Sequence, residues 1–85
     1  MKAPIELISE VSSKGSFCVF VASLAADFQT NSERWENATI DQFLEALASW
    51  TKDMEGYYNN LNLAIPKNVD WKTFAEMLMA ASVYE

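Results

Sequence analysis

The chain contains no histidine, a single cysteine (Cys18) and only two glycines among its 85 residues. Without histidine, the usual general base at neutral pH is missing, and no serine or cysteine has the partner that would activate it as a nucleophile. A lone cysteine cannot form an intrachain disulfide, and without histidine it cannot complete a structural zinc site. Gly15 and Gly56 are isolated, so they cannot build a phosphate-binding loop. The sequence therefore predicts a protein that is not an enzyme and has no cofactor and no metal.

Long apolar runs are also lacking. The longest, residues 17–26, is interrupted by Ser23 and is too short to span a bilayer. Glu6 and Glu10 fall where a secretory signal would need an uninterrupted apolar core. A single cysteine is also simplest to explain in a reducing compartment. These features predict a soluble, cytoplasmic protein, and its length predicts one domain over residues 1–85.

Basic residues are scarce, since six Lys and Arg oppose twelve Asp and Glu and give a net charge of −6. This balance argues against a nucleic acid or an anionic membrane as partner. Most of the excess is local: residues 27–55 contain seven carboxylates but only Arg34 and Lys52, a net charge of −5. A basic protein partner is compatible with this stretch, and so is a charged face that is merely solvated.

The clearest pattern is an apolar stripe at helical spacing between residues 40 and 61, which indicates an amphipathic helix. Thr39 and Gln42 predict a capping box at its start, in which each side chain bonds the other residue's backbone N–H. Gly56 costs about 1 kcal/mol relative to alanine inside a helix, so we expect a bend or break at residues 53–56. The stripe consists of Ile40, Phe43, Leu44, Leu47, Trp50, Met54, Tyr57, Tyr58 and Leu61.

Two helices are predicted before this stripe. Pro4 suits the first turn of a short helix, and Ser13 can cap a second helix that runs to about Phe28. This second helix is apolar almost all round, so it should be buried on several sides or covered by another protein. Cys18 lies in it and is expected to be a small buried residue. A strand over residues 16–21, where β-branched and aromatic residues cluster, is the competing interpretation.

The remaining segments are a connection, a loop and a last helix. Trp35 in the connection is expected to pack on the helix that follows it, and Leu63 and Ile65 in the loop of residues 59–68 are expected to pack back onto the core. Asp70 should cap the last helix, whose inward stripe is Trp71, Phe74, Ala75, Leu78 and Ser82. The predicted fold class is all-α: a small antiparallel helical bundle of three main helices plus one or two short helical pieces.

The candidate site is the acidic stretch with the tyrosine pair that follows it. Neighbouring residues on a helix lie about 100° apart, so Tyr57 and Tyr58 cannot both face the core, and one should be exposed. Tyrosine beside carboxylates is typical of interface anchors, although a core edge beside a solvated face is the simpler alternative. We expect Tyr58→Ala or Asp41→Lys to abolish partner binding without unfolding the protein. The predicted partner-binding residues are Glu33, Glu36, Asp41, Glu45, Asp53, Glu55, Tyr57 and Tyr58.

From about Val11 onward, the chain resembles a family of uncharacterised bacterial domains of unknown function. The resemblance implies a bacterial origin and a small standalone domain, and it brings no activity with it. The residues that carry it are Trp35, Glu36, Asn37, Phe43, Leu44, Glu45, Ala46, Trp50, Tyr57, Tyr58, Pro66, Trp71, Ala80, Ala81, Tyr84 and Glu85.

A looser, architectural resemblance is to the immunity proteins that neutralise colicin-type nucleases, which are similarly short, acidic and helical. Those proteins cover a basic toxin with an acidic helix and a tyrosine pair that follows it. Here Asp41 and Glu45 would stand on the acidic helix, with Asp53, Tyr57 and Tyr58 after it. The sequence departs from that pattern, because Asp53 lies four residues before Tyr57 rather than three and no proline follows Tyr58. The resemblance implies an inhibitor that binds a basic protein.

Two other functions are compatible with the sequence. The first is a structural or oligomerising module, in which the helix of residues 17–28 pairs with a second copy to form a homodimer. The second is a small-molecule binder with a pocket lined by Trp35, Trp50, Trp71 and the methionines, although residues at helical spacing belong to the core far more often.

Overall fold

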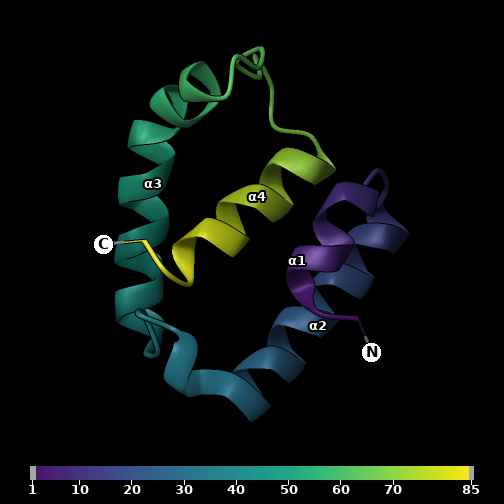
Figure 1. Cartoon of the computed structure of the whole chain (residues 1–85), viewed down its shortest axis with the longest axis vertical. Helices are drawn as coiled ribbons and strands as arrows, with labels where there is room; N and C mark the ends of the chain where they lie inside the picture. Colours follow the sequence, from purple (N-terminus) through teal and green to yellow (C-terminus); the bar gives the residue numbers. More distant parts are fainter. Residues whose placement is uncertain (1, 85) are drawn as a thin grey trace.

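The computed structural model describes residues 2–84, and every regular element in this range is helical (Figure 1). The main helices are α2 (Lys14–Asn31), α3 (Ile40–Asn60) and α4 (Trp71–Ala81); the short elements are α1 (Pro4–Leu7) and the 3₁₀ helices η1 (Ile8–Glu10) and η2 (Ser32–Arg34). The predicted all-α class with three main helices and shorter pieces is confirmed. The alternative strand at residues 16–21 is wrong, because that segment lies inside α2. Glu85 is outside the described residues.

Local side-chain contacts fix where the main helices begin. The Ser13 hydroxyl accepts a hydrogen bond from the Ser16 N–H at 3.2 Å, and Asp70 accepts one from the Thr73 N–H at 2.7 Å. Thr39 accepts from the Gln42 N–H at 3.4 Å, as predicted. The other half of the predicted capping box, a hydrogen bond from the Thr39 N–H to the Gln42 side chain, is not formed. The Thr39 hydroxyl also donates to Asp41.

Helix α3 runs without a break through Gly56, so the predicted break at residues 53–56, which was the alternative to a bend, is wrong. The burial of Trp50 and Tyr58 on either side of this segment holds the helix together, and burying one large aromatic side chain contributes more than the roughly 1 kcal/mol that glycine costs. The helix ends at Asn60, after which Asn62 adopts a left-handed conformation (φ 57°) and the Leu63 N–H donates back to the Tyr58 carbonyl at 2.9 Å.

Replacement of Gly56 by alanine should therefore stabilise the protein. A Cβ atom added at Gly56 would have no neighbouring atom within 4 Å, and alanine is favoured over glycine in a helix by about 1 kcal/mol. Urea denaturation should show a gain of about that size in the free energy of unfolding. A loss of stability would mean that α3 is not regularly helical at this position.

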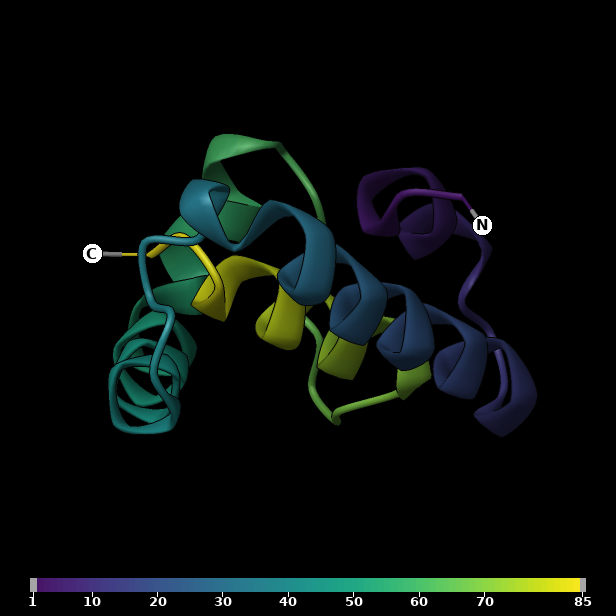
Figure 2. The same cartoon turned by 90° about the horizontal axis from the view of Figure 1, so that it is seen from below.

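The helices are arranged around α4, which lies between α2 and α3 (Figures 1 and 2). Helices α2 and α3 each pack on α4 and make little contact with one another. The short elements α1 and η1 cover one face of α2 and α4, and the Ser23 hydroxyl fastens this segment by donating to the Lys2 carbonyl at 2.8 Å. Within residues 2–84, helix α4 makes its main contacts with α2, α3 and η1, so the side of α4 turned away from η1 is bounded by α2 and α3.

The core lies between α2, α4 and the η1 segment. Its buried members are Val11, Phe20, Leu24 and Ala75. Cys18 is exposed, contrary to the prediction, because it lies about 160° around α2 from Phe20.

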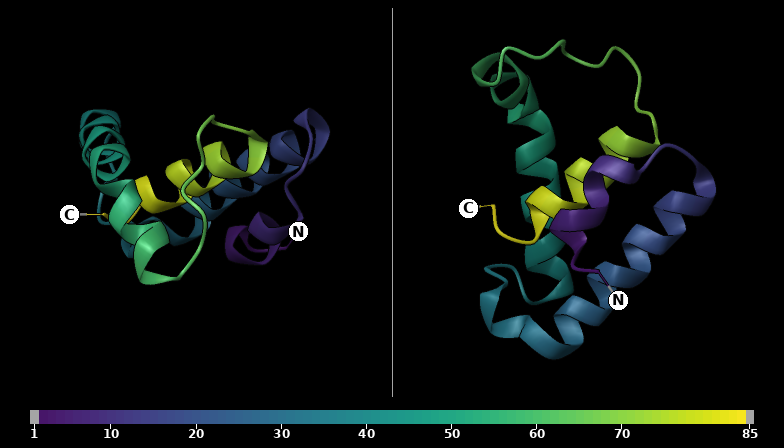
Figure 3. Two further views of the ribbon diagram at one scale, coloured as in Figure 1. Left: turned by 90° about the horizontal axis from the view of Figure 1, so that it is seen from above. Right: turned by 45° about the vertical axis from the view of Figure 1, so that its right-hand side comes forward.

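Several predicted core residues are instead exposed. Leu63 and Ile65 do not pack back onto the core, because residues 61–70 arch across the space between the end of α3 and the start of α4 (Figure 3). Trp71 and Phe74 are 41% and 38% exposed, and Ile40 and Leu44 are more exposed still. The stripes on α3 and α4 are thus apolar but only partly covered.

Candidate functional site

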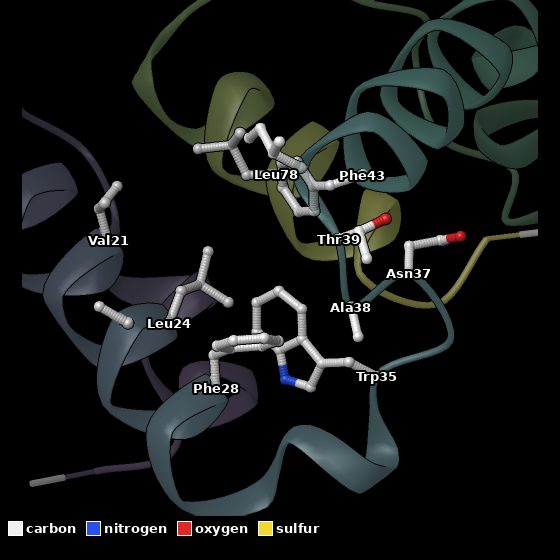
Figure 4. A pocket seen from close by; sticks show the side chains of 11 residues that line it. Val21, Leu24, Phe28, Trp35, Asn37, Ala38, Thr39, Phe43 and Leu78 are labelled. Carbon is white, nitrogen blue, oxygen red and sulfur yellow. The ribbon is translucent and has the colours of Figure 1, made fainter.

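An apolar groove lies where the end of α2, the start of α3 and the end of α4 meet (Figure 4). It has a volume of about 430 Å³. Only two of its lining side chains are polar, Asn37 and Thr39. The full lining consists of Val21, Leu24, Ala25, Phe28, Trp35, Asn37, Ala38, Thr39, Ile40, Phe43 and Leu78. We call this feature the apolar groove.

Trp35 forms one wall of the apolar groove and is fixed by both polar and aromatic contacts. Its indole N–H donates to the Asp27 carboxylate at 2.8 Å. Its ring meets Phe28 edge to face, with centroids 5.1 Å apart, and stacks on Phe43 at 6.1 Å. The prediction that Trp35 packs on the following helix is confirmed. Hydrogen bonds from Trp35 and then Asn31 lower the pKa of Asp27, so its carboxylate is charged at neutral pH.

Asn37 closes the groove at the connection between α2 and α3. Its side-chain amide donates to the carbonyls of Ala81 at 2.9 Å and Tyr84 at 2.7 Å. Its backbone N–H donates to the Ser82 carbonyl at 3.2 Å. Three hydrogen bonds from one residue therefore join the connection to the end of α4, and with Trp35 they make the groove a preformed feature.

The predicted acidic site residues fall into two groups along α3. Glu33 and Glu36 lie just before the helix, and Asp41 and Glu45 lie on its first two turns; all four are exposed. Asp41 follows Ile40, and Glu36 precedes Asn37, so both stand beside groove residues in the sequence. We call Glu36 and Asp41 the acidic surround of the groove. Asp27 bonds Trp35 but lines a different hollow with Lys2. Glu45 lines another hollow, with Ser49 and Tyr84.

The second group lies at the other end of α3. Glu55 is exposed, and the exposed Asp53 accepts a hydrogen bond from the Tyr84 hydroxyl at 2.6 Å. Tyr57 is 39% exposed, and its ring packs edge-on against Trp50 with centroids 5.4 Å apart. Tyr57 lies sixteen residues after Asp41, which places it about 24 Å along the helix and about 160° around it. The structure therefore does not bring the tyrosine pair and the first acidic group into one surface.

Tyr58 is a core residue rather than a surface anchor. Its side chain is 4% exposed, and its hydroxyl donates to Glu76 on α4 at 2.9 Å. The expectation that one of the two tyrosines is exposed is confirmed, and that one is Tyr57. The prediction that Tyr58→Ala leaves the fold intact is inconsistent with the burial of Tyr58, because the substitution would leave a cavity between α3 and α4.

The Tyr58 hydroxyl should make stability depend on alkaline pH. Burial, followed by the hydrogen bond to Glu76 and its charge, raises the pKa of Tyr58 above the ordinary value of 10.0. The raised pKa of Tyr58 contributes to the free energy of unfolding below about pH 10. This contribution is lost as the pH rises further, because the tyrosine of the unfolded chain then releases its proton before that of the folded protein. The free energy of unfolding should fall by up to about 1.4 kcal/mol per pH unit, as urea titrations above about pH 10 would show.

In the Tyr58→Phe variant, the free energy of unfolding should fall much less steeply above about pH 10. Tyr84→Phe is the matched control, since the hydrogen bond to Asp53 also raises the pKa of Tyr84 but its ring is less buried. If the free energy of unfolding of Tyr58→Phe still fell as steeply above about pH 10, the burial of the Tyr58 hydroxyl would not be the cause of the pH dependence.

Other candidate sites are less developed. A second hollow of about 430 Å³ lies on the opposite face and includes Ile5, Trp50, Tyr57 and Glu76. Trp71 lies elsewhere, against Phe17 with ring centroids 5.3 Å apart. The predicted pocket shared by three tryptophans is therefore wrong. Within residues 2–84, no group of three or more acidic or cysteine side chains could hold a metal ion.

The apolar groove was not predicted as a site, because its lining combines residues 21–43 with Leu78 from α4. The only signal in the sequence was the nearly all-apolar character of α2, which indicated burial on several sides or cover by another protein.

The fold and the groove define a small all-α domain with a preformed apolar surface. The chain belongs to a family of unknown function (DUF7660), which matches residues 13–85. The match begins at Ser13, the cap of α2, so α1 and η1 precede it. No match was found among curated proteins or among solved structures. No helix in the described part of the chain has both the length and the hydrophobicity needed to cross a membrane.

Proposed function

We propose that this domain is a protein-interaction module that binds a basic protein partner through the apolar groove. The observation that carries the proposal is the exposure of large apolar side chains around a preformed hollow. Ile40 is 73% exposed at the rim, and Val21 and Phe28 are also open to solvent. Contiguous apolar surface of this kind typically marks a binding site on a small domain.

The charges around the groove favour a basic partner. The connection between α2 and α3 and the first turn of α3, which adjoin the groove in the chain, carry Glu33, Glu36 and Asp41, with Arg34 as the basic residue among them. Lysine and arginine side chains at the edge of a partner would steer its approach and pair with these carboxylates. A second copy of the chain would instead bring a further net charge of −6 to the same surface, which disfavours self-association through the groove.

An inhibitor or immunity protein that covers a basic toxin is the finer form of this proposal. The looser sequence resemblance supports it, but the contact surface differs from the predicted one. The first acidic group and the apolar groove replace the tyrosine pair, since Tyr58 is buried and Tyr57 lies on another side of α3.

Site-specific photo-crosslinking in the producing cells tests the proposal. A photoreactive residue at Ile40 should capture a basic protein that the same residue at Ile5 does not capture. Ile5 is 67% exposed on the opposite face, so it is closely matched to Ile40. The captured protein must then bind the purified domain with an affinity that falls as salt rises and that Ile40→Lys, but not Ile5→Lys, weakens. Equal crosslinking from both positions, or no reconstituted binding, would overturn the proposal.

A second candidate function, a homodimeric structural module, is favoured by the outer side of α2. Cys18, Val19 and Ala22 are exposed there, away from α4. Sedimentation equilibrium should then show a dimer that Val19→Lys dissociates. A monomer at all concentrations would remove this candidate.

A further inference from the structure

We infer that the apolar groove takes a single amphipathic α-helix of about three to four turns, apolar on one face and rich in lysine or arginine on the flanks. The inference rests on the proposed function and specifies the part of the partner that enters the groove.

The hydrogen-bonding capacity of the groove favours a helix over an extended segment. Of its two polar side chains, Asn37 already bonds the end of α4, and Thr39 bonds Asp41 and the Gln42 N–H. The groove therefore offers little to the N–H and C=O groups of an extended peptide, and burying those groups unpaired is costly. A helix satisfies its own backbone hydrogen bonds, so it can enter an apolar surface without this cost.

The shape of the fold sets the length of the occupant. Leu78 of the groove shares a face of α4 with Phe74 and Trp71. Phe74 and Trp71 are 38% and 41% exposed, so apolar side chains are open to solvent from the groove toward the start of α4. Phe17 of α2 borders the far end of this apolar surface, with ring centroids 5.2 Å from Phe74 and 5.3 Å from Trp71. Helix α4 has 11 residues, which correspond to about 16 Å. A partner helix of about 11 to 14 residues would match this track and would add a fourth main helix to the bundle.

The recognition pattern follows from this geometry. Apolar residues of the partner at positions i, i+3 or i+4, and i+7 would pack along the track, as in other helix-in-groove complexes. Basic residues on the flanks would face Glu36, which adjoins Asn37 of the groove, and Asp41 at the start of α3.

A titration with designed peptides tests the inference. The probe is an amidated peptide of about 14 residues, with leucine at helical i, i+3, i+4 and i+7 spacing and lysine elsewhere. A second peptide has the same composition with leucine and lysine alternating, which suits an extended strand, and a third has glutamate in place of lysine. Fluorescence anisotropy measures the affinity of each peptide, and circular dichroism measures the helicity of the bound peptide. A shift of the NMR signal of the Trp35 indole N–H shows that the peptide binds in the groove.

The helical lysine peptide should become helical on binding, shift the Trp35 signal and bind at least about tenfold more tightly than the other two. Ile40→Lys should weaken it about tenfold, while the matched Ile5→Lys should leave it unchanged. If the alternating peptide bound as tightly as the helical lysine peptide, the inference that the occupant is a helix would be wrong, while the proposed function would stand. Absence of any shift at Trp35, or equal affinity for Ile40→Lys and the parent, would also overturn the inference. Failure of the crosslinking experiment is a separate result and bears on the proposed function itself.

Discussion

The Phe20→Ala variant is expected to lose about 3 to 5 kcal/mol of its free energy of unfolding. Phe20 is 0% exposed and packs in the core with Val11, Leu24 and Ala75. Truncation removes the transfer free energy of the ring and leaves a cavity that helices held on two sides cannot fully close. A domain of this size has only about 3 to 5 kcal/mol of net stability from its core, so the variant should be largely unfolded at 25 °C.

Far-UV circular dichroism and urea denaturation would measure this effect. Val19→Ala is the matched control, because Val19 is the next residue on the same helix but is exposed on its outer side. Its free energy of unfolding should change by less than about 0.5 kcal/mol. A folded Phe20→Ala protein with the parent's unfolding midpoint would contradict the position of the core.

Tyr58→Ala is expected to be nearly as destabilising, by about 3 kcal/mol or more. It removes a buried ring between α3 and α4 and leaves Glu76 without the hydroxyl that donates to it. Tyr58→Phe keeps the ring and loses only the hydrogen bond, so its cost should be about 1 to 2 kcal/mol. The difference between the two variants in urea denaturation separates packing from hydrogen bonding.

Equal stability of Tyr58→Ala and the parent would show that Tyr58 is not packed against α4. Loss of partner binding in Tyr58→Ala would report unfolding rather than a lost contact. Asp41→Lys is the better test of the acidic surround, because Asp41 is exposed and its main structural contact is with the neighbouring Thr39. Its expected cost in stability is small, from loss of the favourable interaction with the helix dipole.

The starts of the helices could be predicted from the sequence because they depend on local chemistry. Ser13, Thr39 and Asp70 each accept a hydrogen bond from a backbone N–H three residues later, so the signal and its effect lie within one turn. The break at Gly56 was wrongly predicted because the helix there depends on contacts that are distant in the sequence. A local preference of about 1 kcal/mol was outweighed by packing against α4, a contact that the spacing of α3 alone does not reveal.

The location of the candidate site could not be predicted from the sequence. It depends on which part of each apolar stripe is covered by other helices, and this is decided by tertiary packing. Periodicity placed Ile40 and Trp71 on inward faces, yet both remain open because α2 and α3 diverge around α4. It also placed Tyr57 and Tyr58 on different sides of one helix, but only the packing of α4 decides which of them is buried. The acidic surround was predictable as a charge excess, whereas the groove beside it was not.

The three hydrogen bonds of Asn37 have a practical consequence for experiments on this domain. They hold the backbone at Ser82 and Tyr84 next to Asn37, which lines the groove. A fluorophore attached at Tyr84 would therefore sit beside the surface being assayed. Val19 is exposed on the outer side of α2 and does not line the groove, so a label placed there leaves that surface open.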